Sequence, residues 1–110
     1  MRYGAQLLQG TLELMILKTL TRESMNGYAI SQWIRDQTRE DILIEEGALY
    51  PALHRMEARG LLSSDWGVSE NNRRAKYYAL TRAGRAELSE QERNWQRYTR
   101  AVARVLQPVR

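Results

Sequence analysis

The stretch EEGALYPALHRMEARGLL, at Glu45–Leu62, carries the strongest indication of fold in this sequence. Its large apolar side chains follow the spacing of one buried helical face, at Leu49, Leu53 and Met56. Pro51 is compatible with a helix only in the first turn, where the missing amide hydrogen has no partner to lose. Because Gly60 is a natural C-terminal stop, the pattern predicts a helix over Gly47–Arg59.

The other side of this predicted helix is small and polar, so it is free to contact a partner. The helical repeat places Tyr50 on the flank and the remaining side chains opposite the apolar stripe. These candidate contact residues, including the two small ones at the helix start, are Gly47, Ala48, Tyr50, Pro51, His54 and Arg55.

Two shorter helices are expected before this one. Helical spacing of apolar residues predicts the first over Thr11–Thr21, with Thr11 as its N-cap. After a turn, Asn26 is expected to cap a second helix over Gly27–Gln37. The acidic segment Thr38–Glu46 then predicts a connection to the third helix.

A hairpin and a long helix are expected after it. Alternating residues predict one strand that starts at Leu62 and a return strand over Ala75–Leu80. One face of the first strand would carry Leu62, Trp66 and Val68. The turn at Glu70–Arg73 contains two asparagines, which tolerate the positive φ of tight hairpins. Thr81 is expected to cap the last helix, over Arg82–Leu106.

The order of elements predicts the fold class. Three helices, a two-stranded hairpin and a long helix indicate a mainly α, α+β protein with a winged helix-turn-helix. The second and third helices would form the helix-turn-helix, and the hairpin would be the wing. We expect residues 1–81 to form this domain and residues 82–110 to form a C-terminal dimerisation helix.

Composition restricts the class of protein. The chain has 110 residues, of which 43% are hydrophobic and 27% charged, as in an ordinary globular domain. No apolar run approaches the roughly 20 residues that span a bilayer, and no signal peptide is readable, so no membrane contact and a cytoplasmic location are expected. With no cysteine, one histidine and no catalytic motif, no metal site, no cofactor and no enzymatic activity are expected.

The basic residues are unevenly distributed and are mostly arginine. The net charge is +4, and fifteen of the seventeen basic side chains are arginine, which binds phosphate and guanine in bidentate geometry. Residues 73–85 include no acidic side chain and carry Arg73, Arg74, Lys76, Arg82 and Arg85. Such a patch is typical of nucleic-acid binding, although a merely solvated basic face is the alternative that charge leaves open.

Three stretches resemble one known family. They are GTLELMILKTL at Gly10–Leu20, the stretch at Glu45–Leu62, and NNRRAKYYALTRAG at Asn71–Gly84. Over roughly Leu7–Glu87 the chain is similar to the PadR-like transcriptional regulators, and its single C-terminal helix resembles the smaller subgroup. The resemblance implies a homodimeric regulator, usually a repressor, that binds a pseudo-palindromic operator in double-stranded DNA. It also implies, for many members, release by a small aromatic or amphipathic effector.

The expected DNA contacts lie on the third helix, on the wing and at the start of the second helix. A recognition helix inserts its N-terminal residues into the major groove, and a basic wing can enter the adjacent minor groove. The full set is Tyr28, Gly47, Ala48, Tyr50, Pro51, His54, Arg55, Asn72, Arg73, Arg74 and Lys76. The alternatives are that Tyr50 packs on the second helix and that Arg55 and the wing tip are only solvated. Of Tyr77 and Tyr78, alternation allows one to face the core.

The last predicted helix carries an apolar seam. Two sets of residues repeat every seven positions and are offset by three, which is the pattern of a coiled-coil interface. On a lone chain the seam would expose a sizeable apolar patch, so packing against a second copy is expected. The expected interface is Leu12, Leu88, Trp95, Tyr98, Val102, Val105 and Leu106. The seam could instead pack on the first helix of its own chain.

Two questions stay open at the level of sequence. Trp95 and its symmetry mate could sandwich a planar aromatic ligand, as a comparable tryptophan pair does in some PadR-like proteins, or Trp95 could be an interface anchor alone. A winged helix can also serve as an adaptor that binds protein rather than DNA. Basic rather than apolar side chains on the third helix and wing favour DNA.

Overall fold

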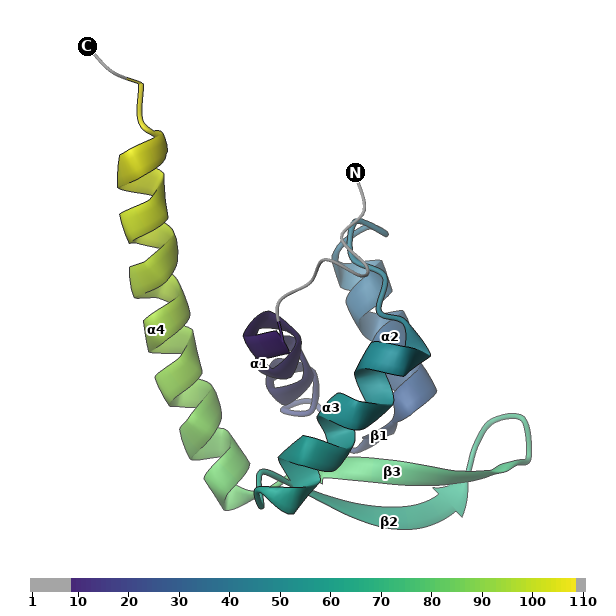
Figure 1. Cartoon of the computed structure of the whole chain (residues 1–110). Helices are drawn as coiled ribbons and strands as arrows, with labels where there is room; N and C mark the ends of the chain where they lie inside the picture. The colour runs from purple at the N-terminus through teal and green to yellow at the C-terminus, as the bar shows by residue number, and fades with distance from the viewer. Residues whose placement is uncertain (1–8, 109–110) are drawn as a thin grey trace.

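The computed structural model describes residues 9–108, so the ends of both predicted domains, at residues 1–8 and 109–110, lie outside the described residues. The helices and strands follow one another in the predicted order, with one additional short strand (Figure 1). The elements are α1 Gln9–Thr19, β1 Met25–Asn26, α2 Gly27–Gln37, α3 Glu46–Ala58, β2 Leu62–Val68, β3 Arg74–Leu80 and α4 Arg82–Leu106. The protein is therefore α+β, and the predicted fold class is confirmed.

The core lies between the first three helices and the sheet. Leu49, Leu53 and Met56, the predicted stripe of α3, are each at most 1% exposed and pack on α1 and α2. Among the described residues, the other large apolar side chains that are fully buried include Ile16, Leu17, Ile30 and Tyr78. Burial of this apolar surface holds the helix-turn-helix together, because each helix hides its one apolar face against the others.

Two of the three predicted helix caps are present. Asn26 caps α2, since its side-chain oxygen accepts a hydrogen bond from the amide of Ala29 at 2.8 Å. Thr81 caps α4 in the same way, with the amide of Gly84 at 3.0 Å from its hydroxyl oxygen. The prediction for Thr11 is wrong, because α1 already begins at Gln9 and Thr11 lies inside its first turn.

The sheet has three antiparallel strands in the order β1-β3-β2. β1 was not predicted, because two residues are too few for the alternation that identifies a strand; it pairs Met25 with Tyr78 and Asn26 with Tyr77. Tyr78 faces the core at 2% exposure, and burial raises the pKa of its hydroxyl. Tyr77 lies on the opposite face and donates a hydrogen bond to the carbonyl oxygen of Val68 at 3.0 Å.

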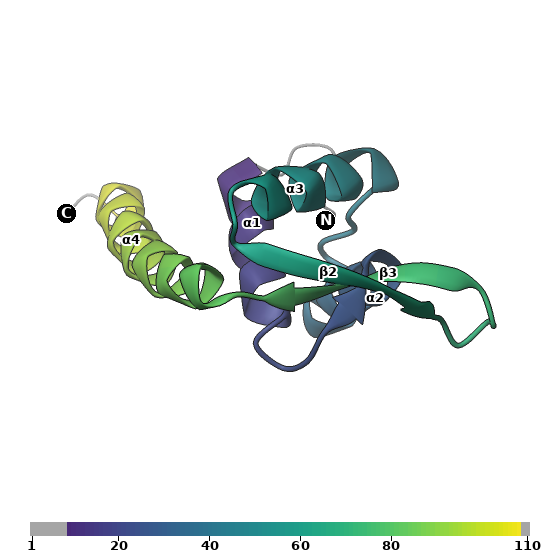
Figure 2. The same ribbon diagram turned by 90° about the horizontal axis from the view of Figure 1, so that it is seen from below.

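The hairpin of β2 and β3 projects beyond the core as a wing (Figure 2). Its register runs from Leu62 opposite Leu80 to Val68 opposite Arg74. The predicted shared face of β2 is present, but it is buried only at Leu62; Trp66 is 60% exposed because no helix covers the outer half of the hairpin.

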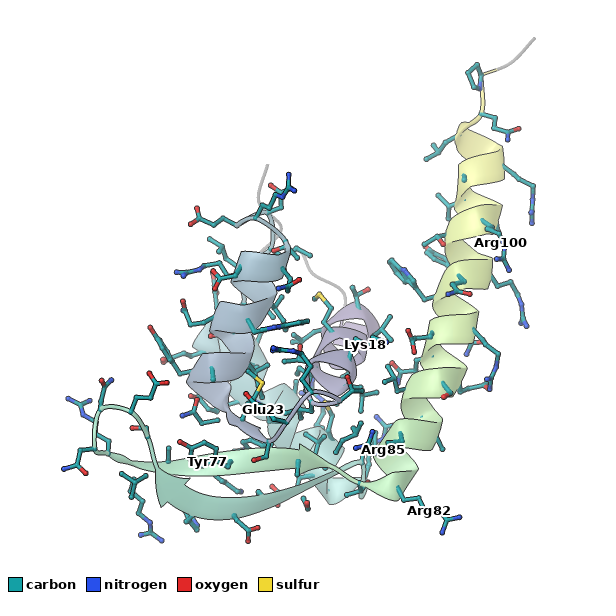
Figure 3. The ribbon with its side chains drawn as sticks, turned by 180° about the vertical axis from the view of Figure 1, so that it is seen from behind. Lys18, Glu23, Tyr77, Arg82, Arg85 and Arg100 are labelled. Carbon is teal, nitrogen blue, oxygen red and sulfur yellow. The ribbon has the colours of Figure 1, made fainter. Side chains whose placement is uncertain are left out.

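The first half of helix α4 runs beside α1, and its second half extends away from the domain (Figure 1). Only Gly84 and Leu88 of this helix are buried, and every residue from Arg100 to Pro108 is exposed. Figure 3 shows Lys18 on the side of α1 that faces α4, where its ammonium nitrogen lies 3.5 Å from a carboxylate oxygen of Glu92. None of the helices within residues 9–108 is long and apolar enough to cross a lipid bilayer.

Candidate nucleic-acid interface

A groove of about 670 Å³ lies between α3 and the wing. Helix α3 and the N-terminus of α2 form one wall, and the paired strands β2 and β3 form the other. Six of the predicted contact residues line this groove: Tyr28, Tyr50, His54, Arg73, Arg74 and Lys76. The fold thus brings together side chains that are separated by as many as 48 positions in the sequence.

The first turns of α3 are open to a partner. Gly47, Ala48, Pro51 and His54 are all exposed, and no atom would lie within 4 Å of a side chain added at Gly47. Glu45 is the N-cap residue of α3, but its side chain makes no capping hydrogen bond. The exposed amides of a helix start favour an anion, so this end of α3 can approach a phosphate.

Tyr50 packs on α2 as well as lining the groove. A side chain at Gly27 would lie 2.7 Å from the ring of Tyr50. The absence of a side chain at Gly27 therefore allows α2 and α3 to approach each other here. The ring is still 37% exposed, and its groove-facing edge remains available for contact. Packing of Tyr50 on α2 is therefore compatible with a contact between Tyr50 and DNA.

Arg55 points toward α1 instead of into the groove. Its Nε atom lies 3.8 Å from a carboxylate oxygen of Glu13, and it is absent from the groove lining. Arg59 donates to the same carboxylate at 3.0 Å and lies 3.8 Å from that of Glu87. Glu13 is a carboxylate only 5% exposed, and its charge attracts both nearby arginines. A DNA contact by Arg55 stays a prediction, and it would compete with this ion pair.

The basic residues of the wing differ in exposure and in ion pairing. Arg73 is exposed at the tip, next to Asn72, whose φ of 56° is the left-handed conformation that asparagine tolerates in turns. Lys76 lies 3.1 Å from Glu57, which raises the pKa of the lysine. A hydrogen bond from Ser64 lowers the pKa of Glu57 the most, and one from Lys76 lowers it further. The charge of Lys76 is therefore partly neutralised within the protein.

Arg74 is held by an aromatic ring. The central carbon of its guanidinium lies 4.3 Å from the centroid of the Trp66 ring. Sequence reasoning missed Trp66 as part of the site, although the available signal was its alternation with Leu62 across from the basic strand β3. Both side chains line the groove.

Comparison with known proteins identifies the family. The family model described as "Transcriptional regulator PadR-like family" matches residues 16–90. The chain belongs to the PadR-like transcriptional regulators. The transcriptional regulator Rv3488 of Mycobacterium tuberculosis is 39% identical to it over 71 residues, which cover 64% of this chain and 65% of that one.

Solved structures of similar proteins share the fold along most of this PadR-like chain. A transcriptional regulator from Clostridium thermocellum matches with a TM-score of 0.85 and 28% identity, over 94% of this chain and 100% of that one. A PadR-like transcriptional regulator from Bacillus cereus matches with a TM-score of 0.79 and 30% identity, over 96% of this chain and 100% of that one. The winged helix and the long last helix therefore match as one unit.

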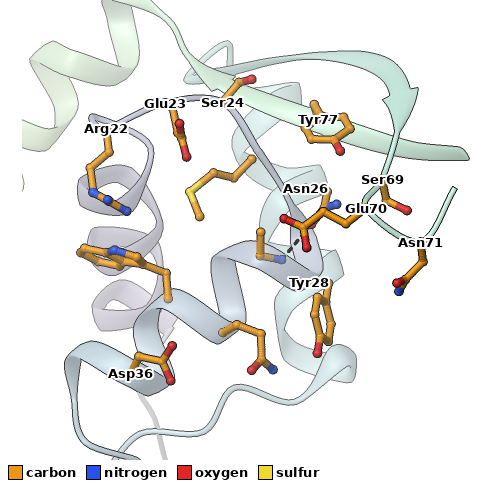
Figure 4. Close-up of a pocket in the computed structure, with 14 residues that line it drawn as sticks. Arg22, Glu23, Ser24, Asn26, Tyr28, Asp36, Ser69, Glu70, Asn71 and Tyr77 are labelled. Carbon is orange, nitrogen blue, oxygen red and sulfur yellow. Dashed lines mark hydrogen bonds between the residues drawn. The ribbon is translucent and has the colours of Figure 1, made fainter. Parts of the chain in front are cut away.

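A second cleft of this PadR-like regulator differs in charge from the groove. It has a volume of about 470 Å³ and lies between α2 and the wing tip (Figure 4). Carboxylates of Glu23, Asp36 and Glu70 line it, and its one arginine, Arg22, lies over the ring of Trp33 at 5.0 Å. A phosphate backbone would be repelled here, so the basic groove is the better nucleic-acid surface. Within residues 9–108, no three His, Cys, Asp or Glu side chains form a metal-binding group.

The seam of α4 is only partly covered by its own chain. Trp95 is 42% exposed, and its ring centroid lies 6.3 Å from that of Tyr98. Two shallow hollows, of about 360 and 230 Å³, adjoin Trp95, and Leu14 of α1 lines both. The seam residues with still larger exposed fractions are Tyr98, Val105 and Leu106, at 59, 82 and 75%.

Two residues of the expected interface are already buried within one protomer. Leu12 is 4% exposed and Leu88 is 6% exposed, and both belong to the core cluster. Neither can bury much further area against a second chain. The exposed part of the seam therefore runs from Trp95 to Leu106, and includes Val102 at 37% exposure.

Proposed function

We propose that this PadR-like chain is a homodimeric, sequence-specific DNA-binding protein that acts as a repressor in the cytoplasm and has no enzymatic activity. The observation that carries the proposal is the groove between α3 and the wing, where open helix turns face basic strands. Residues 1–81 would supply the DNA-binding domain, and residues 82–110 would join two copies.

The geometry of DNA binding follows from the fold. The exposed turns of α3, from Gly47 to His54, would enter the major groove, and the wing tip around Arg73 would reach the flanking minor groove. In a dimer the two α3 helices would lie about 34 Å apart and contact successive turns of a pseudo-palindromic operator. Phosphate contacts by Arg73 and Arg74 would make the affinity strongly dependent on salt.

Dimerisation through α4 is supported by the exposed apolar seam. Exposed apolar residues form a strip along α4, whose remaining exposed side chains are mostly charged or polar; the strip is Trp95, Tyr98, Val102, Val105 and Leu106. An exposed strip of this kind on one long helix is stabilised by a second copy, which covers it with the same residues.

Release by a small effector is the third part of the proposal. The half-exposed ring of Trp95, which two shallow hollows adjoin, supports stacking of a planar aromatic ligand between Trp95 and its symmetry mate in the dimer. Such a ligand would release DNA only if it binds the DNA-incompetent arrangement of the two winged helices more tightly. Trp95→Phe should then weaken binding of the aromatic compound, and an unchanged affinity would exclude stacking on this ring.

The deciding experiment is recovery of genomic DNA fragments by the purified protein at about 50 and 200 mM salt, a range over which phosphate-driven binding falls steeply. We expect a few palindromic fragments to remain bound at the higher salt. Diffuse recovery that disappears at the higher salt would contradict sequence-specific regulation and favour an adaptor that binds protein.

Two variants test the division of labour within the site. Arg74→Ala is expected to weaken binding to every duplex, because phosphate contacts carry no sequence information. His54→Ala is expected to change the order of preference among operator variants, because its side chain lies on the exposed face of α3. Equal losses across all duplexes for both variants would contradict this assignment.

A further inference from the structure

The face of the wing that lines the groove carries a large, exposed indole. Trp66 on β2 is 60% exposed, and its pairing with Lys76 places it on the same side of the hairpin as the basic residues of β3. Scattered exposed apolar side chains are common and need no explanation. Trp66 is different, because the side chain that covers its ring is a cation of the candidate interface.

The strand register explains this contact. Trp66 lies opposite Lys76 and Val68 lies opposite Arg74, so Arg74 and Trp66 are diagonal neighbours on one face. At 4.3 Å from the ring centroid, the guanidinium is within the distance of a cation–π contact. Contact with the ring face leaves the N–H groups at the edge of the guanidinium free to donate.

Arg74 and Lys76 differ in what else they contact. Lys76 is paired with the carboxylate of Glu57 at 3.1 Å. Among residues 9–108, no carboxylate forms an ion pair with Arg74. Arg74 is therefore ordered by an uncharged aromatic surface and keeps its full charge for an external anion.

We propose that Trp66 is a positioning residue that holds Arg74 ready for a phosphate of the DNA strand that occupies the groove between α3 and the wing. The inference rests on the proposed DNA-binding function and adds the residue that prepares its main phosphate contact. Ordering a long side chain costs conformational entropy when it binds. The indole lowers this cost because it restricts the arginine before DNA arrives.

A double-mutant cycle tests this role. Dissociation constants are measured on an operator duplex and on a scrambled duplex at low salt for the wild type, Trp66→Leu, Arg74→Ala and the double variant. We expect Trp66→Leu to weaken binding about fivefold on both duplexes, the size of an exposed cation–π contact. The double variant should bind no more weakly than Arg74→Ala, because Trp66 acts through Arg74.

Val68→Ala is the matched control. Val68 is an apolar residue of the same strand face, directly opposite Arg74 and 66% exposed, but it carries no ring. Val68→Ala should change the affinity for DNA less than twofold. In a double variant with Arg74→Ala, the two losses of affinity should multiply, as expected for independent positions. Trp66→Phe keeps an aromatic face and should recover most of the affinity that Trp66→Leu loses.

Thermal unfolding of each variant separates a loss of folding from a loss of contact. If Trp66→Leu does not fold, Arg74→Lys carries the test, because lysine keeps the charge but not the planar contact with the indole. We then expect a loss of about fivefold in affinity at unchanged charge.

Several outcomes would overturn the proposal. They are wild-type affinity for Trp66→Leu or for Arg74→Lys, losses that multiply in the double variant, and no binding of any duplex by the wild type. Failure of sequence-specific regulation gives a different result: equal affinity for the operator and scrambled duplexes, with the coupling between Trp66 and Arg74 still present.

Discussion

A buried carboxylate joins α1 to the helices on both sides of it. Glu13 is 5% exposed, and it accepts a hydrogen bond from Arg59, the C-cap residue of α3, which also lies near Glu87 of α4. A buried charge is tolerated only when it is paired and hydrogen-bonded, so these contacts are required by the position of Glu13. They also connect α3 with the helix proposed to form the dimer.

Arg59→Ala should therefore destabilise the folded state. We expect a loss of about 1–2 kcal/mol in the free energy of unfolding, the value of a hydrogen bond to a charged group discounted for the partial exposure of Arg59. Chemical denaturation measures the change. Arg100→Ala is the control, since Arg100 lies on the exposed outer part of α4 (Figure 3), and should leave stability within about 0.5 kcal/mol. Equal stability of both variants would contradict the role assigned to Glu13.

The contact between Glu57 and the wing predicts a pH dependence. Hydrogen bonds from Ser64 and Lys76 lower the pKa of Glu57 below its ordinary value of 4.5. The ionised form therefore stabilises the folded state above pH 4.5, and this contribution is lost as the pH falls through the lowered pKa. The difference in melting temperature between the wild type and Glu57→Gln should shrink below pH 4.5. A difference that is constant with pH would contradict this contribution.

Among the elements, α4 is docked through a glycine. A side chain at Gly84 would lie 2.2 Å from the backbone carbonyl oxygen of Leu61, a contact that the backbone cannot relieve by a rotamer change. Gly84→Ala should therefore lower the free energy of unfolding by about 3 kcal/mol, the range of an overpacked site.

Gly47→Ala is the matched control for this prediction. Gly47 is also a helical glycine, but open space surrounds the position of its missing side chain. Alanine favours a helix over glycine by about 0.5–1 kcal/mol, so Gly47→Ala should leave stability unchanged or raise it. Equal destabilisation by the two variants, measured by denaturant unfolding, would exclude the close packing of α4 as the cause.

The whole molecule is elongated, with principal extents of 59 × 30 × 21 Å, because α4 extends beyond the domain. Its exposed seam predicts the oligomeric state. Val102→Arg places a charge in the proposed contact and should convert a dimer into a monomer, observed as a halved mass in analytical ultracentrifugation. Arg97→Ala, on the polar side of the same helix, should remain dimeric. A dimer of unchanged strength for Val102→Arg would contradict association through this seam.

Much of the fold could be predicted because its determinants are local in sequence. The buried stripe of α3 depends on residues within two helical turns, and the caps at Asn26 and Thr81 depend on amides three positions away. The hairpin depends on alternation and on turn residues. The same local patterns identified six of the thirteen residues that line the groove, since the exposed side of an amphipathic helix follows from its buried side.

Other features required contacts between distant parts of the chain. Arg59 and Glu13 are 46 positions apart, so no periodic pattern could show that the C-terminal end of α3 faces a buried carboxylate. For the same reason, the ion pair of Arg55 with that carboxylate could not be predicted. The strand β1 exists only because β3 lies beside it, and Trp66 is exposed only because the core ends before the outer half of the wing. Local periodicity specifies which face of an element is apolar, whereas the packing of the elements determines which residues that face contacts.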